Sequence, residues 1–588
     1  MTYPLWIYDT TLRDGAQREG ISLSSDDKVR IARKLDQLGV PFIEGGWPGA
    51  NPKDVQFFWQ LQEQPLTQAE VVAFCSTRRP NRTAADDAML QPVLAAGTRW
   101  VTLFGKSWDL HVTEGLKTTL DENLAMIDDT VRFFRQHNRR VIYDAEHWFD
   151  GYCQNPSYAL ETLRVAIAAG VEWVVLCDTN GGTLPHDVAQ GVAAVMGNTG
   201  VQSGPQIDPR IDQVDPQTGQ RVGPQPAAAF ARNLASAENV EPAAPRLGIH
   251  THNDSGTAVA NAIAAVINGA QMVQGTINGY GERCGNANLC TLIANLQLKL
   301  GYSCVPGLQL QQLTDTSRFV SEVVNLAPDD HAPFVGLSAF AHKGGIHVSA
   351  VQRNPITYEH VSPEAIGNQR RIVISDQAGL SNVLAKARHF GIELERDHPA
   401  CRQILQQLKT LESRGYQFEA AEASFELLMR GALGERYCLF ELQGFQVHCE
   451  VAPSADLWHS NSLATIKVTV GDEEVLEGAE GNGPVSALDA ALRKALVRFY
   501  PAIAQFQLLD YKVRILDGTS GTSAKTRVLI ESGDGQQRWT TVGVSTNILD
   551  ASYQAVVEGL EYGLLLQSDH TLAQQVSIHA RCQTVMPQ

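Results

Sequence analysis

Short apolar runs alternate with amphipathic helical patterns through the first 300 or so residues, and this alternation restricts the fold more than any other feature. The runs predict eight strands, at residues 5–9, 42–45, 71–75, 100–104, 141–145, 173–177, 246–250 and 272–275. Helical patterns such as 26–38 and 84–96 lie between them. Eight such units fit a TIM (β/α)8 barrel, with an open doubly wound sheet as the alternative. Polar residues at the strand ends favour the barrel, because barrel active sites are assembled there.

The rest of the chain predicts two further parts, which divides the 588 residues into three domains. Residues 1–305 form the catalytic barrel, and 306–430 form a mostly helical linker with a loop-rich portion at 339–379. Residues 431–588 are expected to form an α+β domain in which alternating strands, such as 464–470 and 525–530, precede helices that begin at Pro484 and Thr546. This order predicts an internal repeat, with a ligand pocket between the two copies.

Residues 197–245 are rich in Gly, Pro, Gln and Asp and predict a surface insertion, or else a partner-binding loop.

Charge and composition exclude several classes of protein. The formal net charge is −17, whereas a protein that binds nucleic acid needs a basic surface. No apolar run reaches the roughly 18 residues of a membrane span, and no secretion signal is visible at the N-terminus. The ten cysteines include no C-x-x-C pair. Reduced thiols in a cytoplasmic protein are therefore expected.

Two histidines, His250 and His252, predict half of a divalent-metal site. Residues i and i+2 of a strand point to the same face, so both imidazoles converge. Asp14, at the end of the first strand, and Asn286, in a glycine-rich loop after the eighth, would supply two oxygens because these strands are neighbours in a closed barrel. The set suits Mg²⁺, Mn²⁺ or Zn²⁺. The alternative is an ordinary pair of strand histidines. The spacing of the glycines excludes a dinucleotide site.

Four further residues are candidates for catalysis or substrate binding. Arg13, beside Asp14, would stabilise a developing enolate or alkoxide, or else form a surface salt bridge. Glu146 ends the fifth strand and could act as a base, or cap a helix. Thr179 could bind a substrate carboxylate, or serve as an N-cap. His347 follows two glycines, Gly344 and Gly345, beyond the barrel and is either a catalytic or a structural loop histidine.

Together these residues resemble a known enzyme family. The segments D-T-T-L-R-D-G-x-Q at 9–17, H-x-H-N-D at 250–254 and G-E-R-x-G-N-A at 281–287 are similar to those of the metal-dependent acyl-CoA condensing enzymes that make 2-isopropylmalate, homocitrate and citramalate. Residues 44–54 and 104–108 look most similar to the citramalate synthase branch. The tail resembles the regulatory domain of the family.

The resemblance implies a Claisen-type acyltransferase that condenses acetyl-CoA with pyruvate and hydrolyses the thioester. It implies a role in isoleucine and branched-chain amino acid biosynthesis, isoleucine as the feedback effector, and a homodimer in which the segment after the barrel lies over a neighbouring barrel. The catalytic residues would be Arg13, Glu146 and His347, and Gln17, Thr179 and Phe104 would join Arg13 in binding substrate. Whether Glu146 or His347 is the base stays open.

Three alternatives differ in testable ways. A 2-isopropylmalate or homocitrate synthase would need a deeper pocket for a larger ketoacid, whereas the bulky Phe104 and Trp47 favour a short one. A lyase that runs the reverse cleavage would not need the long tail. A non-catalytic amino-acid sensor would not need the intact metal and arginine residues.

Overall fold

The computed structural model describes residues 3–204, 244–436, 439–453 and 458–567. They form two compact units, Met1–Phe340 with Glu359–Arg370, and Ala341–Tyr358 with Arg371–Gln588. The predicted helical linker at 306–430 contributes to both units, so the units do not follow the three predicted domains. The predicted insertion at 197–245 has its central residues, 205–243, outside the described part of the chain.

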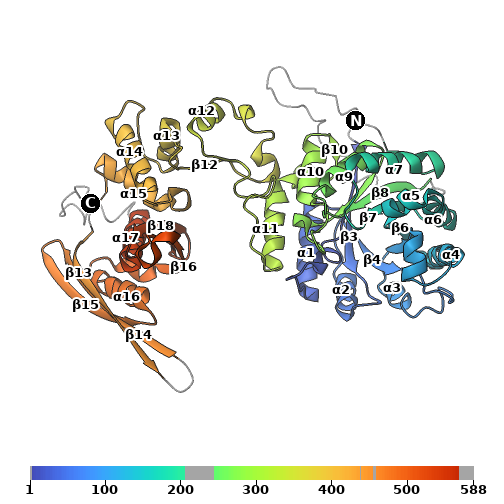
Figure 1. Ribbon diagram of the computed structural model, residues 1–588, viewed down its shortest axis with the longest axis horizontal. Coiled ribbons are helices and arrows are strands. Elements are labelled where there is room, and N and C mark those ends of the chain that lie inside the picture. Colours follow the sequence, from blue (N-terminus) through green and yellow to red (C-terminus); the bar gives the residue numbers. More distant parts are fainter. Residues whose placement is uncertain (1–2, 205–243, 437–438, 454–457, 568–588) are drawn as a thin grey trace. The chain divides into compact units, whose positions relative to one another are not determined.

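Eight parallel strands of the first unit close into a barrel in sequence order (Figure 1). They are β2 (Trp6–Asp9), β3 (Phe42–Gly46), β4 (Glu70–Ser76), β5 (Trp100–Lys106), β6 (Arg140–Glu146), β7 (Trp173–Asp178), β8 (Arg246–Thr251) and β9 (Met272–Gly275). Strand β9 pairs with both β8 and β2, which closes the ring. The predicted TIM barrel is confirmed, and each of the eight predicted strands is present.

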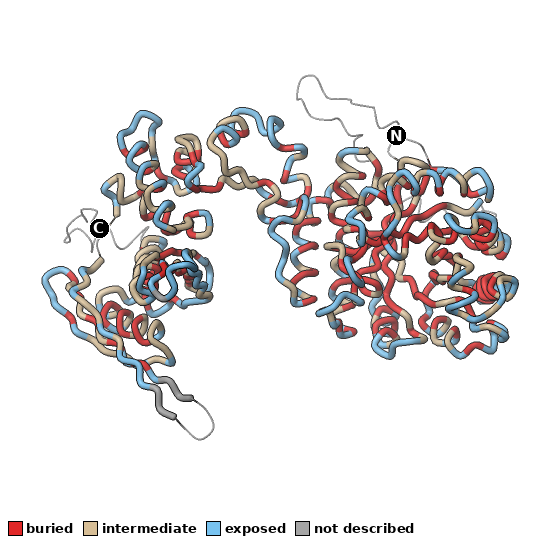
Figure 2. Tube along the Cα trace, viewed as in Figure 1, coloured by how far each residue is buried: buried red, intermediate tan, exposed pale blue. Residues whose placement is uncertain are grey.

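Helices surround the strands of the barrel, and buried residues concentrate along those strands (Figures 1 and 2). The helices are α1 (Ser25–Leu38), α2 (Pro52–Glu63), α3 (Gln91–Ala95), α4 (Leu120–Gln136), α5 (Trp148–Gln154), α6 (Pro156–Ala169), α7 (Pro185–Asn198), α9 (Ala258–Ile267) and α10 (Leu289–Leu298). The helix predicted at 84–96 is wrong in length, since only α3 forms. Pro92 sits in the first turn of α3, where proline is tolerated, and the Asp87 carboxylate accepts from the backbone N–H groups of Arg79 and Met89, which holds the preceding residues in turns.

The inside of the barrel changes from aromatic to polar along the strands. One interior cluster includes Phe42, Trp100, Ile142 and Met272, and the rings of Phe42 and Trp100 lie 5.2 Å apart, edge to face. Two residues further along the same four strands, at Glu44, Thr102, Asp144 and Gln274, the buried side chains are polar. Side chains at i and i+2 share a face, so these four form a polar layer towards the carboxyl ends of the strands.

The first unit is completed by β1 (Tyr3–Pro4), which pairs with β10 (Tyr302–Ser303), and by α11 (Leu313–Val323), which packs on α1. The second unit begins with a short parallel pair, β11 (Ala341–His342) and β12 (Arg371–Ile372). Its helices before the tail are α12 (Gly345–Arg353), α13 (Leu380–His389), α14 (Pro399–Ser413) and α15 (Glu422–Leu433).

The tail contains the predicted repeat of a three-stranded sheet and a helix. Strands β13 (Glu441–Pro453), β14 (Trp458–Val470) and β15 (Glu473–Gly481) form one antiparallel sheet, and α16 (Pro484–Leu496) packs on it. Strands β16 (Gln507–Ile515), β17 (Thr526–Gly533) and β18 (Arg538–Ser545) form the second, which α17 (Ile548–Gln567) covers. The two helices share a core with both sheets. The internal repeat is therefore confirmed.

Two further observations concern the described residues alone. None of their helices combines the length and the apolar character that crossing a bilayer requires. The eight cysteines among them are all free thiols.

Candidate active site

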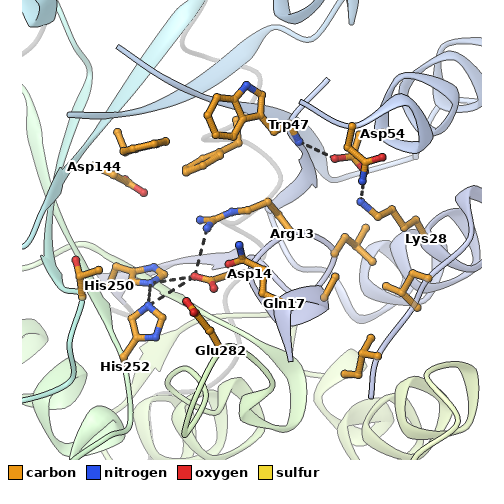
Figure 3. Close-up of a pocket in the computed structure, with 18 of the residues that line it drawn as sticks. Arg13, Asp14, Gln17, Lys28, Trp47, Asp54, Asp144, His250, His252 and Glu282 are labelled. Atoms are coloured by element: carbon orange, nitrogen blue, oxygen red, sulfur yellow. Dashed lines mark hydrogen bonds and ion pairs between the residues drawn. The ribbon is translucent and has the colours of Figure 1, made fainter. Parts of the chain in front are cut away.

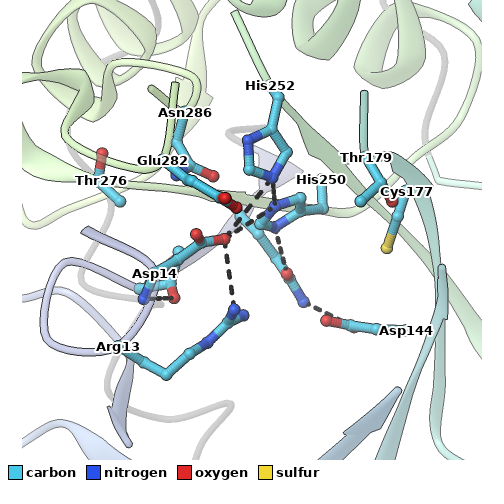
Figure 4. Close-up of polar contacts among 12 residues, drawn as sticks. Arg13, Asp14, Asp144, Cys177, Thr179, His250, His252, Thr276, Glu282 and Asn286 are labelled. Atoms are coloured by element: carbon cyan, nitrogen blue, oxygen red, sulfur yellow. Dashed lines mark hydrogen bonds and ion pairs between the residues drawn. The ribbon is translucent and has the colours of Figure 1, made fainter. Parts of the chain in front are cut away.

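Asp14, His250 and His252 come together at the carboxyl end of the barrel (Figure 4). Asp14 Oδ2 lies 3.4 Å from His250 Nε2 and 3.7 Å from His252 Nε2, and the two Nε2 atoms are 3.1 Å apart. All three side chains are buried, and one ligand atom from each lies within 4.8 Å of the others. This is the donor set of a divalent-cation site, with one hard oxygen and two imidazole nitrogens.

Asn286 lies beside this cluster (Figure 4), and its side-chain oxygen is available as a ligand. Its Nδ2 donates to the Tyr280 carbonyl at 3.1 Å, whereas its Oδ1 is buried and has no hydrogen-bond partner within the described part of the chain. Its backbone forms a bridge with His252. Gly281 has φ +152°, and a Cβ there would lie 2.2 Å from Asn286 Nδ2, so glycine permits this close approach. An unpaired buried carbonyl oxygen next to three ligand atoms fits a fourth metal ligand.

The local charges keep Asp14 ionised. Burial opposes its charge, but Arg13 and the two histidines hold its pKa well below the usual range. Burial also opposes charge on His250, yet the hydrogen bond and charge of Asp14 outweigh it and raise the pKa of that imidazole. Burial, with His250 adding to it, lowers the pKa of His252 to about 3. An ionised carboxylate beside a neutral imidazole is the state that binds a cation.

Arg13 is held between the metal cluster and the barrel interior. Its Nη1 lies 3.4 Å from Asp14 Oδ2, and its Nε donates to Glu44 Oε2 at 2.6 Å. Glu44 also accepts from the hydroxyls of Tyr8 at 2.7 Å and Thr10 at 2.5 Å. The guanidinium lies 3.8 Å over the Phe74 ring. These contacts fix a permanent positive charge at the site, with its position set by a fully buried carboxylate.

A cavity of about 510 Å³ opens above these groups (Figure 3). Gln17, Phe104, Glu146 and Thr179 all line it, together with the metal cluster and Arg13. Five of the six predicted substrate and catalytic residues therefore line one cavity, although their individual roles stay predictions. Thr179 Oγ1 accepts from the His147 backbone N–H at 2.9 Å, and its own hydrogen remains available to donate.

Aromatic rings form one wall of this cavity. Phe74 and Phe104 stack with centroids 5.2 Å apart, and Trp47 meets Phe104 edge to face at 5.8 Å. The Trp47 backbone N–H donates to Asp54 at 2.8 Å, and the Asp54 carboxylate in turn accepts from Lys28. The buried Lys28–Asp54 pair thus holds the loop that carries Trp47 against the cavity.

Glu146 ends β6 and points into the cavity beside a cation from the neighbouring strand. Lys106 pairs with it in register on β5, and the Lys106 ammonium forms an ion pair with the Glu146 carboxylate. Both side chains are 22% exposed. Two residues earlier, burial raises the pKa of Asp144 to about 7. Strand β6 therefore presents two carboxyl groups to the cavity: Glu146, which is paired with a lysine, and Asp144, which is buried and has a raised pKa.

His347 belongs to the second unit, in the first turn of α12, and its ring lies 4.3 Å from that of Tyr358. Its predicted role in the site stays a prediction.

The residues missed by the sequence analysis are Glu44, Lys106, Asp144 and Gln274. Glu44 lies in residues 44–54, which the sequence analysis used only for the family resemblance. The i, i+2 spacing of Asp144 and Glu146 on one strand could have shown that both carboxyl groups face the same side.

Comparison with known proteins assigns three parts of the chain. Residues 5–205 and 216–320 match the HMGL-like family, residues 334–416 match the homocitrate synthase post-HMGL domain-like family, and residues 419–564 match the LeuA allosteric (dimerisation) domain. The barrel and the repeated tail described above correspond to the first and the last of these families.

Several full-length relatives carry one name. The chain is 67% identical to the (R)-citramalate synthase of Synechocystis sp. over 96% of both chains, and 48% identical to that of Geobacter sulfurreducens over 95% of this chain and 97% of the other. The 2-isopropylmalate synthase of Sulfolobus acidocaldarius is 30% identical over 71% of this chain and 93% of its own. The chain thus belongs to the HMGL-like enzymes, in the citramalate synthase family.

Proposed function

We propose that this protein condenses acetyl-CoA with pyruvate and hydrolyses the resulting thioester to give citramalate. The observation that carries the proposal is the cluster of Asp14, His250 and His252, with Arg13 beside it, at the base of the cavity. The cluster joins a cation-binding set to a fixed positive charge. A ketoacid needs both, because it carries one carboxylate and gains charge at its ketone oxygen on attack.

Four residues would hold the divalent cation: Asp14, His250, His252 and the unpaired Oδ1 of Asn286. Bound there, Mg²⁺, Mn²⁺ or Zn²⁺ would act as a Lewis acid towards the ketone and carboxylate oxygens of pyruvate. The mixed nitrogen and oxygen donors accept all three ions.

Arg13 would stabilise the negative charge that develops on the ketone oxygen. Its charge does not depend on pH, because Glu44 and Asp14 raise the already high pKa of the guanidinium against the effect of burial. Glu44 fixes its Nε, which leaves the Nη atoms free to face Asp14 and the cavity. Thr179 would donate its hydroxyl to the substrate carboxylate.

Glu146 would remove a proton from the methyl group of acetyl-CoA, acting with His347. Lys106 forms an ion pair with one oxygen of the Glu146 carboxylate, and Glu146 lines the cavity. The new carbon–carbon bond joins the methyl carbon of acetyl-CoA to the ketone carbon of pyruvate, and the ketone oxygen takes a proton. Water then cleaves the thioester, which releases coenzyme A and makes the overall reaction effectively irreversible.

The aromatic wall supports pyruvate as the ketoacid. Phe74, Phe104 and Trp47 contact one another on the side of the cavity next to Arg13, and bulky rings there would favour a short ketoacid side chain. A single added methylene changes selectivity only modestly, so a direct comparison of ketoacids is required.

The tail would bind an effector and join two chains. It matches an allosteric dimerisation domain, and its repeated sheets and helices provide a pseudo-symmetric pair. We propose a homodimer inhibited by isoleucine, the end product expected of a citramalate route, in a cytoplasmic enzyme.

The test is thiol release from acetyl-CoA with pyruvate, 2-oxobutanoate, 2-oxoisovalerate or 2-oxoglutarate, with and without a chelator and isoleucine. We expect the highest kcat/KM with pyruvate, loss of turnover with chelator, and recovery when a divalent cation is restored. Asp14→Asn, which retains size but removes the charged ligand, should lose activity. Equal turnover in that variant, or a preference for 2-oxoisovalerate, would contradict the proposal.

A further inference from the structure

The two histidines of the metal cluster differ in what holds their second ring nitrogen. His250 Nδ1 lies 2.9 Å from Gln274 Oε1, whereas His252 Nδ1 is buried with no hydrogen-bond partner among the described residues. Both rings nevertheless turn Nε2 towards Asp14. A histidine that binds a metal through one nitrogen ordinarily donates the other N–H to an acceptor, which fixes its tautomer and its orientation. Only His250 has such an acceptor.

Gln274 is placed for this contact by the register of the barrel. It pairs directly with His250 across β8 and β9, and its side chain is fully buried in the polar layer of the barrel interior. Its Nε2 donates to Asp144 Oδ1 at 3.0 Å, on β6. Figure 4 shows this chain of contacts from His250 to Asp144, on the opposite side of His250 from His252. Both ends of the amide therefore have a partner.

The order of these groups determines which histidine nitrogen carries hydrogen. The amide NH₂ of Gln274 donates to Asp144, and the amide oxygen therefore faces His250. An amide oxygen only accepts hydrogen bonds, so Nδ1 of His250 must be the protonated nitrogen. The lone pair of a neutral imidazole then lies on Nε2, which is the atom nearest Asp14.

From this geometry we infer that Asp144 and Gln274 are positioning residues that hold His250 ready to bind the cation through Nε2. His250 is thereby pre-organised in the metal-free protein, whereas His252 has no such support from the described residues. The inference rests on the proposed metal site and deepens it, because it assigns to two interior residues of the barrel an effect on metal affinity.

The test measures the affinity of the metal-free, full-length protein for Mn²⁺ by calorimetry, without substrates. Gln274→Met keeps the volume but removes both hydrogen bonds, and should weaken binding by about 10- to 100-fold, the usual effect of losing such a partner. Gln274→Glu keeps an acceptor for His250 Nδ1. One proton shared between the new carboxylate and Asp144 restores the hydrogen bond to Asp144. The affinity of this variant should stay near that of the original protein.

Asp144→Leu leaves Gln274 in place but removes the group that orients its amide, so it should weaken Mn²⁺ binding in the same direction. This variant also serves if Gln274→Met does not fold. Thr162→Val is the matched control, because Thr162 is fully buried and its hydroxyl donates to the Ala159 carbonyl, away from the metal cluster. It should lower the melting temperature of the metal-free protein and leave Mn²⁺ affinity unchanged.

Asp14→Ala distinguishes a failure of the proposed metal site from a failure of the positioning role of Asp144 and Gln274. If Asp14→Ala abolishes Mn²⁺ binding while Gln274→Met and Asp144→Leu bind normally, the positioning role is overturned and the metal site stands. If Gln274→Met and Gln274→Glu weaken binding equally, the retained acceptor has no effect and the inference also fails. If Asp14→Ala binds Mn²⁺ normally, the metal site itself is misplaced.

Discussion

Replacing Glu44 with glutamine tests whether a buried carboxylate holds Arg13, the arginine proposed to act in catalysis. Glu44 is fully buried and accepts three hydrogen bonds, from Tyr8, Thr10 and Arg13. Glutamine has the same shape, and the Tyr8 hydroxyl can turn to accept from the new amide because it already lies 2.7 Å from Thr102 Oγ1. Glu44→Gln therefore removes the charge while the neutral hydrogen bonds remain possible.

The expected loss of stability follows from the kinds of bond that change. A hydrogen bond to a charged group contributes about 1.5–3 kcal/mol and a neutral one about 0.5–1.5 kcal/mol, so the Tyr8 and Thr10 contacts, whose acceptor loses its charge, should together lose about 1–2 kcal/mol. Glu44→Leu leaves the guanidinium without its buried partner and should cost about 3–5 kcal/mol. Turnover should fall further than stability implies, because a displacement of about 1 Å in a catalytic group can lower the rate 100-fold.

The assay combines denaturant unfolding, followed by tryptophan fluorescence, with steady-state kinetics. Glu172→Gln is the control, since Glu172 also pairs with an arginine, Arg140, but at the opposite end of the strands and with 29% of its side chain exposed. That change should cost no more than about 1 kcal/mol and leave kcat intact. If Glu44→Gln matches the control in both measurements, the reasoning about Arg13 is wrong.

Three further changes have defined outcomes. Arg13→Lys keeps the charge but loses the Nε contact with Glu44, and kcat measured by thiol release should fall about 100- to 1,000-fold. Phe104→Leu opens the aromatic wall, and the ratio of kcat/KM for 2-oxobutanoate to that for pyruvate should rise about 10-fold. Burial raises the pKa of Asp9 from 3.8 to about 7, so its contribution to stability is fully present below pH 3.8 and is lost as the pH rises through 7. Relative to Asp9→Asn, the free energy of unfolding of the original protein should fall by up to about 4 kcal/mol between pH 4 and pH 8, as measured by denaturant titration.

The barrel could be predicted from the sequence because its strands are buried on both faces. Parallel strands inside a ring of helices read as continuous apolar runs, and β7 (Trp173–Asp178) is such a run, buried along its whole length. The helix at 84–96 was overestimated because helical periodicity gives no weight to a side chain such as Asp87 that binds nearby backbone groups. The internal repeat of the tail could be predicted because several strands precede a helix twice in the same order.

The proposed metal ligands could be predicted from the sequence because the spacing of His250 and His252 has a direct geometric meaning in a strand. Glu44 and Gln274 could not, since each is a polar residue in a buried strand whose partner lies more than 20 residues away. Only the register between strands shows that Gln274 lies beside His250 and that Glu44 reaches Arg13. Sequence reasoning therefore identified the groups proposed to contact substrate or metal and missed the groups that hold them.

The missed residues share one physical role, which explains why they are buried. Glu44 holds Arg13 and Gln274 holds His250, and each comes from the polar layer between the aromatic interior of the barrel and the cavity. Burying such groups is unfavourable unless every hydrogen bond is satisfied. Here the partners are the functional side chains themselves, so stability and orientation depend on the same contacts. A substitution in this layer should consequently lower both metal affinity or turnover and the free energy of unfolding, whereas one in the aromatic layer, such as Met272→Leu, should affect the free energy of unfolding alone.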